Sequence, residues 1–234
     1  MKTSYAQQLL KKTENDYNRI AHKFSNTRRN ITDDFKDLKK YLNTDDRILD
    51  LGCGDGRLLE VIGNEKVSYV GADVSGNIIK IAGQKHPKSK FIKINGLKLP
   101  FENDSFDTVF ALAVFHHIPG FTMRAKFIKE IKRVLKKDGK VILTVWNFKK
   151  TKIGKSLILK YGLLSFVRDL DWGDVFYPFS VPEENLTIKR YLHSFSKTEL
   201  ENYFNMFELK ILESKTVTRG KKVINENLMI VAKK

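Results

Sequence analysis

Three closely spaced glycines follow an apolar stretch in the first quarter of the chain. The segment Arg47–Arg57 reads RILDLGCGDGR, and in it Gly52, Gly54 and Gly56 separate a strand-like run from an amphipathic one. Glycine has no Cβ, so its backbone can adopt positive φ and approach a ligand closely. A strand, a glycine turn and a helix N-terminus in this order predict a nucleotide-binding corner.

The spacing of these glycines narrows the class of nucleotide. G-x-G-x-G is shorter than the dinucleotide pattern G-x-G-x-x-G, and no Gly-Lys-Ser/Thr follows that would grip phosphates. The pattern therefore disfavours NAD and ATP.

An acidic residue follows at the distance that suits a ribose. Asp73 ends the apolar run YVGAD, about twenty residues after the glycine turn, where a carboxylate at a strand's carboxyl end accepts hydrogen bonds from ribose hydroxyls. The alternative is that Asp73 caps the helix expected to begin near Ser75.

Strands and helices that would position these residues alternate from residue 46 onward. We expect strands at 47–51, 67–72, 90–94, 105–113 and 139–146, and helices at 56–64, 76–85 and 121–137. Such alternation predicts an α/β fold of right-handed βαβ units, with a mostly parallel sheet covered by helices on both faces.

The flanks of this core have other patterns. Residues 1–45 predict a helical N-terminal cover, with one or two short helices within 3–24 and another that starts at Asp33 or Asp34. Residues 147–195 are first basic and then aromatic, which indicates an insertion. In 196–234, Ser196 and Glu199 form a capping box for a helix through Phe204, and an antiparallel hairpin around residues 219–221 follows. We expect one domain over 1–234.

The charge favours a polyanionic partner. The formal net charge is +16 at pH 7, and such an excess raises the affinity for nucleic acid or an anionic membrane. The alternative is a compositional bias toward lysine.

Targeting and metal signals are missing from the sequence. The N-terminus has no apolar signal region, and the longest apolar run, Val109–Phe115, is too short to cross a bilayer. We expect a cytoplasmic protein without a membrane partner. Cys53 is the single cysteine and has no Cys or His cluster around it, so no metal site is expected.

Two stretches resemble class I S-adenosylmethionine (SAM) methyltransferases. DLGCGDG at 50–56 is similar to their first motif, and INGLKLPFENDSFDTVFALAVFHHI at 94–118 is similar to the segment around their fourth strand. The resemblance implies a Rossmann-like fold with a seven-stranded sheet and a C-terminal antiparallel hairpin. It implies SAM as cofactor, with Asn95 at the adenine amino group, Gly96 and Leu97 over the ring, and Ala111 to Val114 on the methionine side. The implied cofactor residues are Tyr17, Arg28, Asp50, Gly52, Gly54, Asp73, Asn95, Gly96, Leu97 and Ala111.

Flanking stretches resemble a narrower family. YNRIAHKFSNTR (17–28), EIKRVLKKDGKVILTVW (130–146), DVFYPFSVP (174–182) and KRYLHSFSKTELENYF (189–204) are similar to tRNA wobble-uridine carboxymethyl methyltransferases, which esterify 5-carboxymethyluridine in the anticodon. The resemblance implies tRNA as substrate and, as in eukaryotic members, a small zinc-binding activator subunit. Residues 29–32 depart from the family's Pro-Trp-Pro stretch, and the insertion is short for the family.

The resemblance also implies the substrate-side residues, which we expect to be Arg190, Tyr191, His193 and His116. Arg190 is the first candidate to hold a carboxylate because its guanidinium offers forked donors. His116 and His117 are adjacent, so at most one should face the substrate. The alternatives are a solvated charge for Arg190, core packing for Tyr191 and Phe195, and structural roles for the histidines.

Two other functions fit part of the sequence. A small-molecule methyltransferase of the quinone-biosynthesis or general metabolite type would share residues 46–146 without needing the basic insertion. A non-catalytic SAM- or RNA-binding protein would keep the cavity without turnover.

Overall fold

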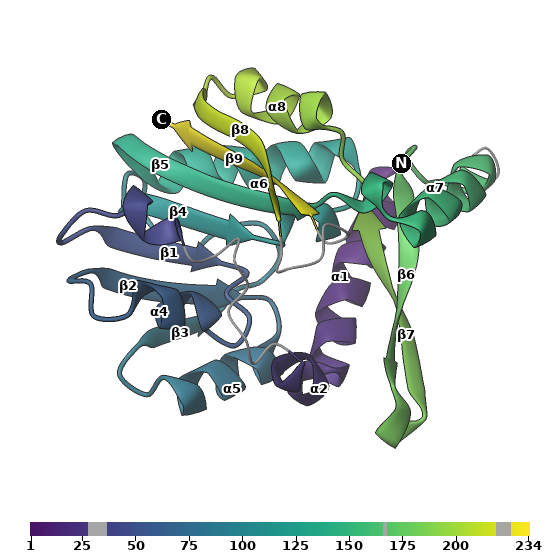
Figure 1. Cartoon of the computed structure of the whole chain (residues 1–234), viewed down its shortest axis with the longest axis horizontal. Coiled ribbons are helices and arrows are strands. Elements are labelled where there is room, and N and C mark those ends of the chain that lie inside the picture. The colour runs from purple at the N-terminus through teal and green to yellow at the C-terminus, as the bar shows by residue number, and fades with distance from the viewer. Residues whose placement is uncertain (28–36, 166–167, 219–225) are drawn as a thin grey trace.

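A mixed seven-stranded sheet forms the centre of the computed structural model, which describes residues 1–27, 37–165, 168–218 and 226–234. The strand order is β3-β2-β1-β4-β5-β9-β8; the first five strands in this order are parallel, and β9 is antiparallel to both of its neighbours (Figure 1). The strands are β1 (Arg47–Leu51), β2 (Ser68–Asp73), β3 (Lys90–Lys93), β4 (Phe106–Leu112), β5 (Leu135–Trp146), β8 (Lys210–Thr218) and β9 (Glu226–Lys233). The predicted fold class is confirmed, including the C-terminal antiparallel hairpin.

Both faces of the sheet are buried, as expected for parallel strands that read as nearly continuous apolar runs. In β4 the side chains alternate between two cores: Val109 and Ala111 pack in one apolar cluster and Phe110 in the other. One face is covered by α4 (Arg57–Ile62) and the 3₁₀ helix η1 (Asp37–Tyr41), and the other by α6 (Phe121–Val134) and α8 (Lys197–Met206).

The N-terminal helices lie across the carboxyl edge of the parallel strands. Residues 3–24 were expected to contain one or two helices and contain two, α1 (Thr3–Arg19) and α2 (Ala21–Asn26), which pack against α5 (Gly76–Lys85). The start of the helix expected from Asp33 or Asp34 lies outside the described residues. Its described part is η1, where Leu38 and Tyr41 are buried.

Two predicted boundaries in the second half of the core differ from the structure. The helix expected over 121–137 ends at Val134, and the strand expected from residue 139 begins at Leu135. Leu135 is already extended and pairs with Phe106, after which the register shifts before Thr108 pairs with Lys140. The segment 135–139 is thus an irregular strand, because its pairing with β4 outweighs its helical pattern.

The insertion forms a separate unit at the carboxyl edge (Figure 1). It contains η3 (Phe148–Lys150), α7 (Lys152–Leu164), and an antiparallel ribbon of β6 (Asp174–Val181) and β7 (Leu186–His193) joined through η4 (Pro182–Glu184). Helix α1 packs against β7 as well as against α5 and α6, so it lies between the ribbon and the core.

The segment after the insertion returns to the core as expected. The Ser196 hydroxyl accepts a hydrogen bond from the Glu199 N–H at 3.1 Å, and the Glu199 carboxylate accepts one from the Ser196 N–H at 3.4 Å, which is the capping box of α8. The turn residues 219–221 between β8 and β9 lie outside the described residues. Within the described chain, none of the helices has the length and apolar character needed to cross a membrane.

Candidate active site

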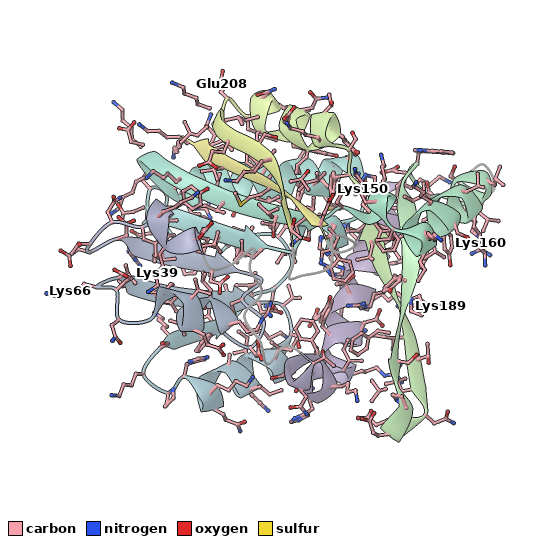
Figure 2. All side chains as sticks on the ribbon, viewed as in Figure 1. Lys39, Lys66, Lys150, Lys160, Lys189 and Glu208 are labelled. Atoms are coloured by element: carbon pink, nitrogen blue, oxygen red, sulfur yellow. The ribbon has the colours of Figure 1, made fainter. Side chains whose placement is uncertain are left out.

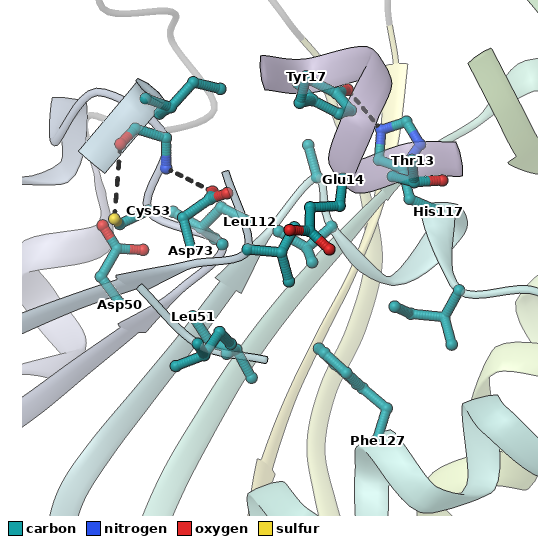
Figure 3. A pocket seen from close by; sticks show the side chains of 18 of the residues that line it. Thr13, Glu14, Tyr17, Asp50, Leu51, Cys53, Asp73, Leu112, His117 and Phe127 are labelled. Carbon is teal, nitrogen blue, oxygen red and sulfur yellow. Dashed lines mark hydrogen bonds between the residues drawn. The ribbon is translucent and has the colours of Figure 1, made fainter. Parts of the chain in front are cut away.

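A cavity of about 370 Å³ opens at the carboxyl edge of the parallel strands. Its walls come from the residues that follow β1, β2 and β4, and helix α1 covers it (Figure 3). Asp50, Cys53 and Asp73 lie on one side of this cavity in Figure 3, and Tyr17 and His117 lie on the other. This is the place where open α/β sheets bind nucleotides.

The glycine turn has the backbone that the sequence predicts. Gly52 and Gly54 have φ of 75° and 56°, a region that other residues rarely adopt. A Cβ on Gly52 would stand 2.1 Å from Cγ2 of Val114, which also lines the cavity. Glycine is therefore required at residue 52 both by conformation and by space.

Asp73 is tied to the glycine turn. Its carboxylate accepts hydrogen bonds from the N–H of Gly54 at 3.1 Å and from the N–H of Ser75 at 2.9 Å. Burial raises the pKa of this carboxyl above its usual value, while the two backbone donors oppose that rise. The cap of α5 is Ser75, whose hydroxyl accepts from the Ile78 N–H at 3.2 Å. Asp73 thus lines the cavity, and Ser75 rather than Asp73 caps α5.

Asp50 is a second acidic group on the same wall. The Tyr69 hydroxyl donates to its carboxylate at 2.8 Å. Burial raises the pKa of Asp50 to about 7, a rise that the hydrogen bond from Tyr69 opposes. A cation bound beside it would favour the ionised form.

These residues fit SAM. The carboxylates of Asp50 and Asp73 suit the cationic methionine end and the ribose hydroxyls of the cofactor, since each carboxylate oxygen can accept more than one hydrogen bond. The close approach required at Gly52 and the apolar wall at Leu97 and Leu99 suit a ligand with a flat base.

The predicted cofactor residues divide into three groups. Those that line the cavity are Tyr17, Asp50, Gly52, Gly54, Asp73, Gly96 and Leu97. Asn95 is exposed outside the lining, and Ala111 is fully buried in the apolar core, because Leu112 to Val114 are the residues of this segment that reach the wall. Arg28 lies outside the described residues. The roles that the sequence assigns to Asn95, Ala111 and Arg28 stay predictions.

The structure brings His117, and not His116, to the cavity. The backbone carbonyl of Tyr191 lies 2.9 Å from Nδ1 of His117, and a carbonyl can only accept, so Nδ1 carries the proton. Nε2 of the same ring shares a hydrogen bond with the Tyr17 hydroxyl at 2.8 Å. His117 thereby joins α1 to β7. The His116 ring instead packs against Trp146, with ring centroids 4.9 Å apart.

Tyr191 and His193 lie in a buried network away from the cavity lining. The Tyr191 hydroxyl and Nδ1 of His193 each lie 2.6 Å from Oδ1 of Asp174, and Arg124 donates to Asp174 at 3.2 Å. Nε2 of His193 lies 2.8 Å from the Glu199 carboxylate. These contacts support a structural function, which corrects the expectation that both side chains face the substrate.

The charges in this network reinforce one another. Burial alone would raise the pKa of the Asp174 carboxyl, but the hydrogen bond and charge of His193, together with Arg124, hold it below its usual range. Burial raises the pKa of Tyr191 well above its usual value. Arg124 comes from α6, Asp174 from β6 and Glu199 from α8, so the network fastens the insertion to the core.

Arg190 has different surroundings from Tyr191. Its side chain is 3% exposed, and its guanidinium carbon lies 4.8 to 5.8 Å from the ring centres of Phe179, Trp146 and Tyr177. Its Nε and Nη1 are buried and have no hydrogen-bond acceptor among the described residues. The solvated charge that the sequence left open for Arg190 is therefore not what the structure shows.

Sequence reasoning did not place Trp146 on the cavity wall, and it did not choose His117 over His116. Trp146 is the last residue of β5, and its position at the carboxyl end of a parallel strand was a usable signal. His117 could not be distinguished from His116, because both lie in the 3₁₀ helix η2 (Phe115–His117), where the alternation of a strand does not apply.

Comparisons with known proteins agree with this geometry. A family model described as a methyltransferase domain matches residues 49–143. The chain is 28% identical over 205 residues to a tRNA (carboxymethyluridine(34)-5-O)-methyltransferase of Schizosaccharomyces pombe, covering 84% of this chain and 88% of that protein. It is 30% identical over 184 residues to the protein of the same name from Arabidopsis thaliana, covering 79% of this chain and 44% of that protein. The chain thus spans most of the first relative and less than half of the second.

Solved structures show the same fold. A SAM-dependent methyltransferase from Methanosarcina mazei superposes with a TM-score of 0.72 at 24% identity, covering 84% of this chain and 96% of that one. A methyltransferase from Haloferax volcanii, solved in complex with the Trm112 methyltransferase activator, gives a TM-score of 0.64 at 15% identity, covering 94% and 96%. The chain thus has the fold of SAM-dependent methyltransferases, contains a stretch that matches the methyltransferase domain, and is similar in sequence to tRNA carboxymethyluridine methyltransferases.

Proposed function

We propose that the protein transfers the methyl group of SAM to the carboxylate of 5-carboxymethyluridine at the wobble position of tRNA, giving the methyl ester. The names of the relatives support this substrate. The observation that carries the proposal within this chain is the buried guanidinium of Arg190.

A buried cation needs an anionic partner, because removing it from water is costly when no partner compensates. Aromatic ring faces supply part of that compensation. Nε and Nη1 of Arg190 still have no acceptor among the described side chains and backbone. Both oxygens of a carboxylate match the forked donors of a guanidinium, and Arg190 packs on Trp146, which lines the cavity.

The chemistry requires little from the protein beyond positioning. When bound, SAM supplies an electrophilic methyl group on a positively charged sulfur. A carboxylate is ionised near neutral pH, so no general base is needed. One carboxylate oxygen forms the new bond to carbon while the carbon–sulfur bond breaks and its electron pair stays on sulfur. Arg190 would orient the carboxylate, and alignment of two bound reactants can be worth about 7–11 kcal/mol.

The Arg190→Met variant tests this proposal. Methionine keeps much of the side chain's length and removes its charge, so methyl transfer to carboxymethyluridine tRNA should fall at least about a hundredfold while the SAM dissociation constant stays unchanged. Arg47→Met is the matched control, because Arg47 is exposed and is the first residue of β1. It therefore lies at the edge of the sheet opposite the cavity. Equal activity in both variants, or loss of SAM binding in Arg190→Met, would place the substrate elsewhere.

The insertion also carries the charge that a tRNA substrate requires. Residues 148–165 contain five lysines and no acidic residue: Lys149, Lys150, Lys152, Lys155 and Lys160. Figure 2 labels Lys150 and Lys160 at the same end of the molecule as Lys189 of β7. We propose that these lysines contact the phosphates of tRNA.

The two other functions have less support. A small-molecule methyltransferase accounts for residues 46–146 but not for the basic insertion, and the relatives are named as methyltransferases rather than as non-catalytic binding proteins. Incubation with methyl-labelled SAM and bulk tRNA, followed by nucleoside analysis, separates the three. We expect label in a uridine ester; label only in small organic molecules, or none, would favour the alternatives.

An activator subunit stays a prediction for this chain, as does a cytoplasmic location. The Haloferax volcanii methyltransferase was solved with such an activator. Co-expression with a small zinc-binding activator tests the requirement: a gain in SAM affinity and a stable complex on gel filtration are the expected results.

A further inference from the structure

We propose that the indole N–H of Trp146 is a second donor to the substrate carboxylate, and that Trp146 and Arg190 form a donor pair that selects a carboxylate over a carboxamide. The inference rests on the proposed function, since it names how that substrate is recognised. The donor pair means the indole Nε1–H of Trp146 and the guanidinium of Arg190.

Trp146 stands where the cofactor cavity meets the insertion. It is the last residue of β5, it lines the cavity, and its ring centre lies 5.5 Å from the guanidinium carbon of Arg190. The Tyr177 ring lies at right angles to the indole, with centroids 6.4 Å apart. The indole is thus held between the core and the β6–β7 ribbon.

Both donor groups have buried N–H groups without a hydrogen-bond acceptor among the described residues. Nε1 of Trp146 is buried and has no acceptor among the described residues, and the same holds for Nε and Nη1 of Arg190. Buried N–H groups are nearly always paired, and each unpaired one costs about 1–3 kcal/mol. Unpaired donors of two residues in contact, one of them on the cavity wall, indicate that a ligand supplies the acceptors.

The two histidines beside Trp146, His116 and His117, already have hydrogen-bond partners of their own. Nδ1 of His117 donates to the Tyr191 carbonyl and Nε2 shares a hydrogen bond with the Tyr17 hydroxyl, so both nitrogens already have partners. Nδ1 of His116 already accepts from the backbone N–H of Trp146 at 3.4 Å.

The chemistry of the pair determines its selectivity. Indole and guanidinium groups donate hydrogen bonds and do not accept them. A carboxylate only accepts, so both of its oxygens can be bound. A carboxamide presents an NH₂ group in place of one oxygen, so this NH₂ donor would face one of the donors of Trp146 or Arg190. A site built around buried polar groups rejects a ligand that mismatches them.

The first experiment observes the indole directly in the unmodified protein. The chain has two tryptophans, so ¹⁵N-tryptophan labelling gives two indole N–H signals, which Trp172→Phe assigns. The probe is an anticodon stem-loop RNA carrying 5-carboxymethyluridine, added with S-adenosylhomocysteine so that no turnover occurs. We expect the Trp146 indole proton to shift downfield with this RNA and not with its 5-carbamoylmethyluridine counterpart. Equal shifts with both RNAs, or none, would overturn the inference.

The second experiment compares two matched substitutions. Trp146→Phe keeps an aromatic ring beside Arg190 and removes the N–H, while Trp172→Phe makes the same change at a side chain that is 60% exposed. The ratio of the dissociation constants for the carbamoylmethyl and carboxymethyl RNAs should fall by about tenfold or more in Trp146→Phe and stay unchanged in Trp172→Phe. An unchanged ratio in both variants, or a weakened affinity of Trp146→Phe for S-adenosylhomocysteine, would remove Trp146 from carboxylate recognition.

Failure of the inference is distinguishable from failure of the proposed function. If the wild-type protein forms the ester but the Trp146 signal does not respond, only the donor pair is wrong. If the signal responds to the carboxymethyl RNA but no ester forms with SAM, the donor pair stands and the proposed reaction is wrong.

Discussion

The two sides of the cavity differ in how their polar groups are satisfied. On the cofactor side, the carboxylates of Asp50 and Asp73 already accept hydrogen bonds from Tyr69, Gly54 and Ser75. On the side of the insertion, Trp146 of the cavity wall and Arg190, which packs against it, have buried donors without acceptors among the described residues. The carboxylates of the cofactor side therefore find their donors within the chain, whereas we propose that a ligand supplies the acceptors on the other side.

This difference in hydrogen bonding coincides with the end of the part of the chain that matches the methyltransferase domain. The family model matches residues 49–143 and ends just before Trp146. Trp146 and Arg190, the two residues of the proposed donor pair, lie beyond it, at the end of β5 and in β7 of the insertion.

Breaking the attachment of the insertion should cost the most stability. Arg124→Met leaves the buried Asp174 carboxylate without its guanidinium partner. Because breaking a buried ion pair is strongly destabilising, the free energy of unfolding should fall by about 3–5 kcal/mol. Chemical denaturation measures the loss, and SAM binding of the folded variant should persist because the cofactor side does not use Arg124. Lys132→Met is the control: it lies on the same helix and pairs at the surface with Glu208 at 3.4 Å, and should lose under about 1 kcal/mol. Equal losses would show that the network does not fasten the insertion.

Disturbing the glycine turn should affect the cofactor instead. Gly52→Ala combines a strained φ with a clash against Val114, and relief of both would move the turn away from Asp73. The strained φ costs about 1–2 kcal/mol and the clash about 1–3 kcal/mol. We therefore expect the SAM affinity, measured by calorimetry, to weaken about a hundredfold. Gly83→Ala on α5 meets no atom within 4 Å and should bind SAM like the wild type. Normal SAM affinity in Gly52→Ala would exclude this turn from the cofactor site.

The raised pKa of Asp50 predicts a pH dependence of cofactor binding. Burial raises this pKa from 3.8 to about 7, so the folded protein without cofactor keeps a proton that the unfolded chain loses near 3.8. The stability of that state should therefore fall as pH rises from about 4 to about 7. Cationic SAM favours the ionised carboxylate, so its affinity should rise with pH by up to about tenfold per unit and level off above about 7.

The Asp50→Asn variant removes both slopes if Asp50 is their cause. Tyr69→Phe removes the hydrogen bond that lowers the Asp50 pKa and should move the inflection to higher pH. An inflection that persists in Asp50→Asn would assign the dependence to another group.

The smallest effect concerns the lysines of the insertion. Lys160→Gln should weaken tRNA binding modestly and reduce the slope of log affinity against log salt by about 1, as measured by filter binding. Lys66→Gln is the control, since Lys66 is exposed and lies at the opposite end of the molecule in Figure 2. Similar slopes in both variants would show that α7 does not contact the phosphates.

The cofactor side could be predicted because local patterns determine it. The glycine turn, Asp73 and the alternating strands each depend on residues close together in the sequence, and the sheet brings their carboxyl ends to one edge. The boundary at Val134 was missed because the pairing of Leu135 with Phe106 is a contact between distant segments.

The substrate side was harder to predict for the same reason. Tyr191 and His193 are polar and lie on matching positions of a known family, yet their partners Arg124, Asp174 and Glu199 come from three separate elements. No local spacing indicates such a network. Arg190 and Tyr191 belong to opposite faces of β7, and the sequence could not show which face packs against Trp146 of the cavity wall.

His117 has a consequence for the order of events in catalysis. Its ring links Tyr17 of the covering helix α1 to the Tyr191 carbonyl of β7. Displacement of α1 to admit SAM would break one of these hydrogen bonds and loosen the attachment of α1 to β7, where we propose that the substrate binds. We therefore expect ordered kinetics, in which SAM enters before tRNA and the spent cofactor departs last, so that S-adenosylhomocysteine inhibits competitively against SAM and not against tRNA.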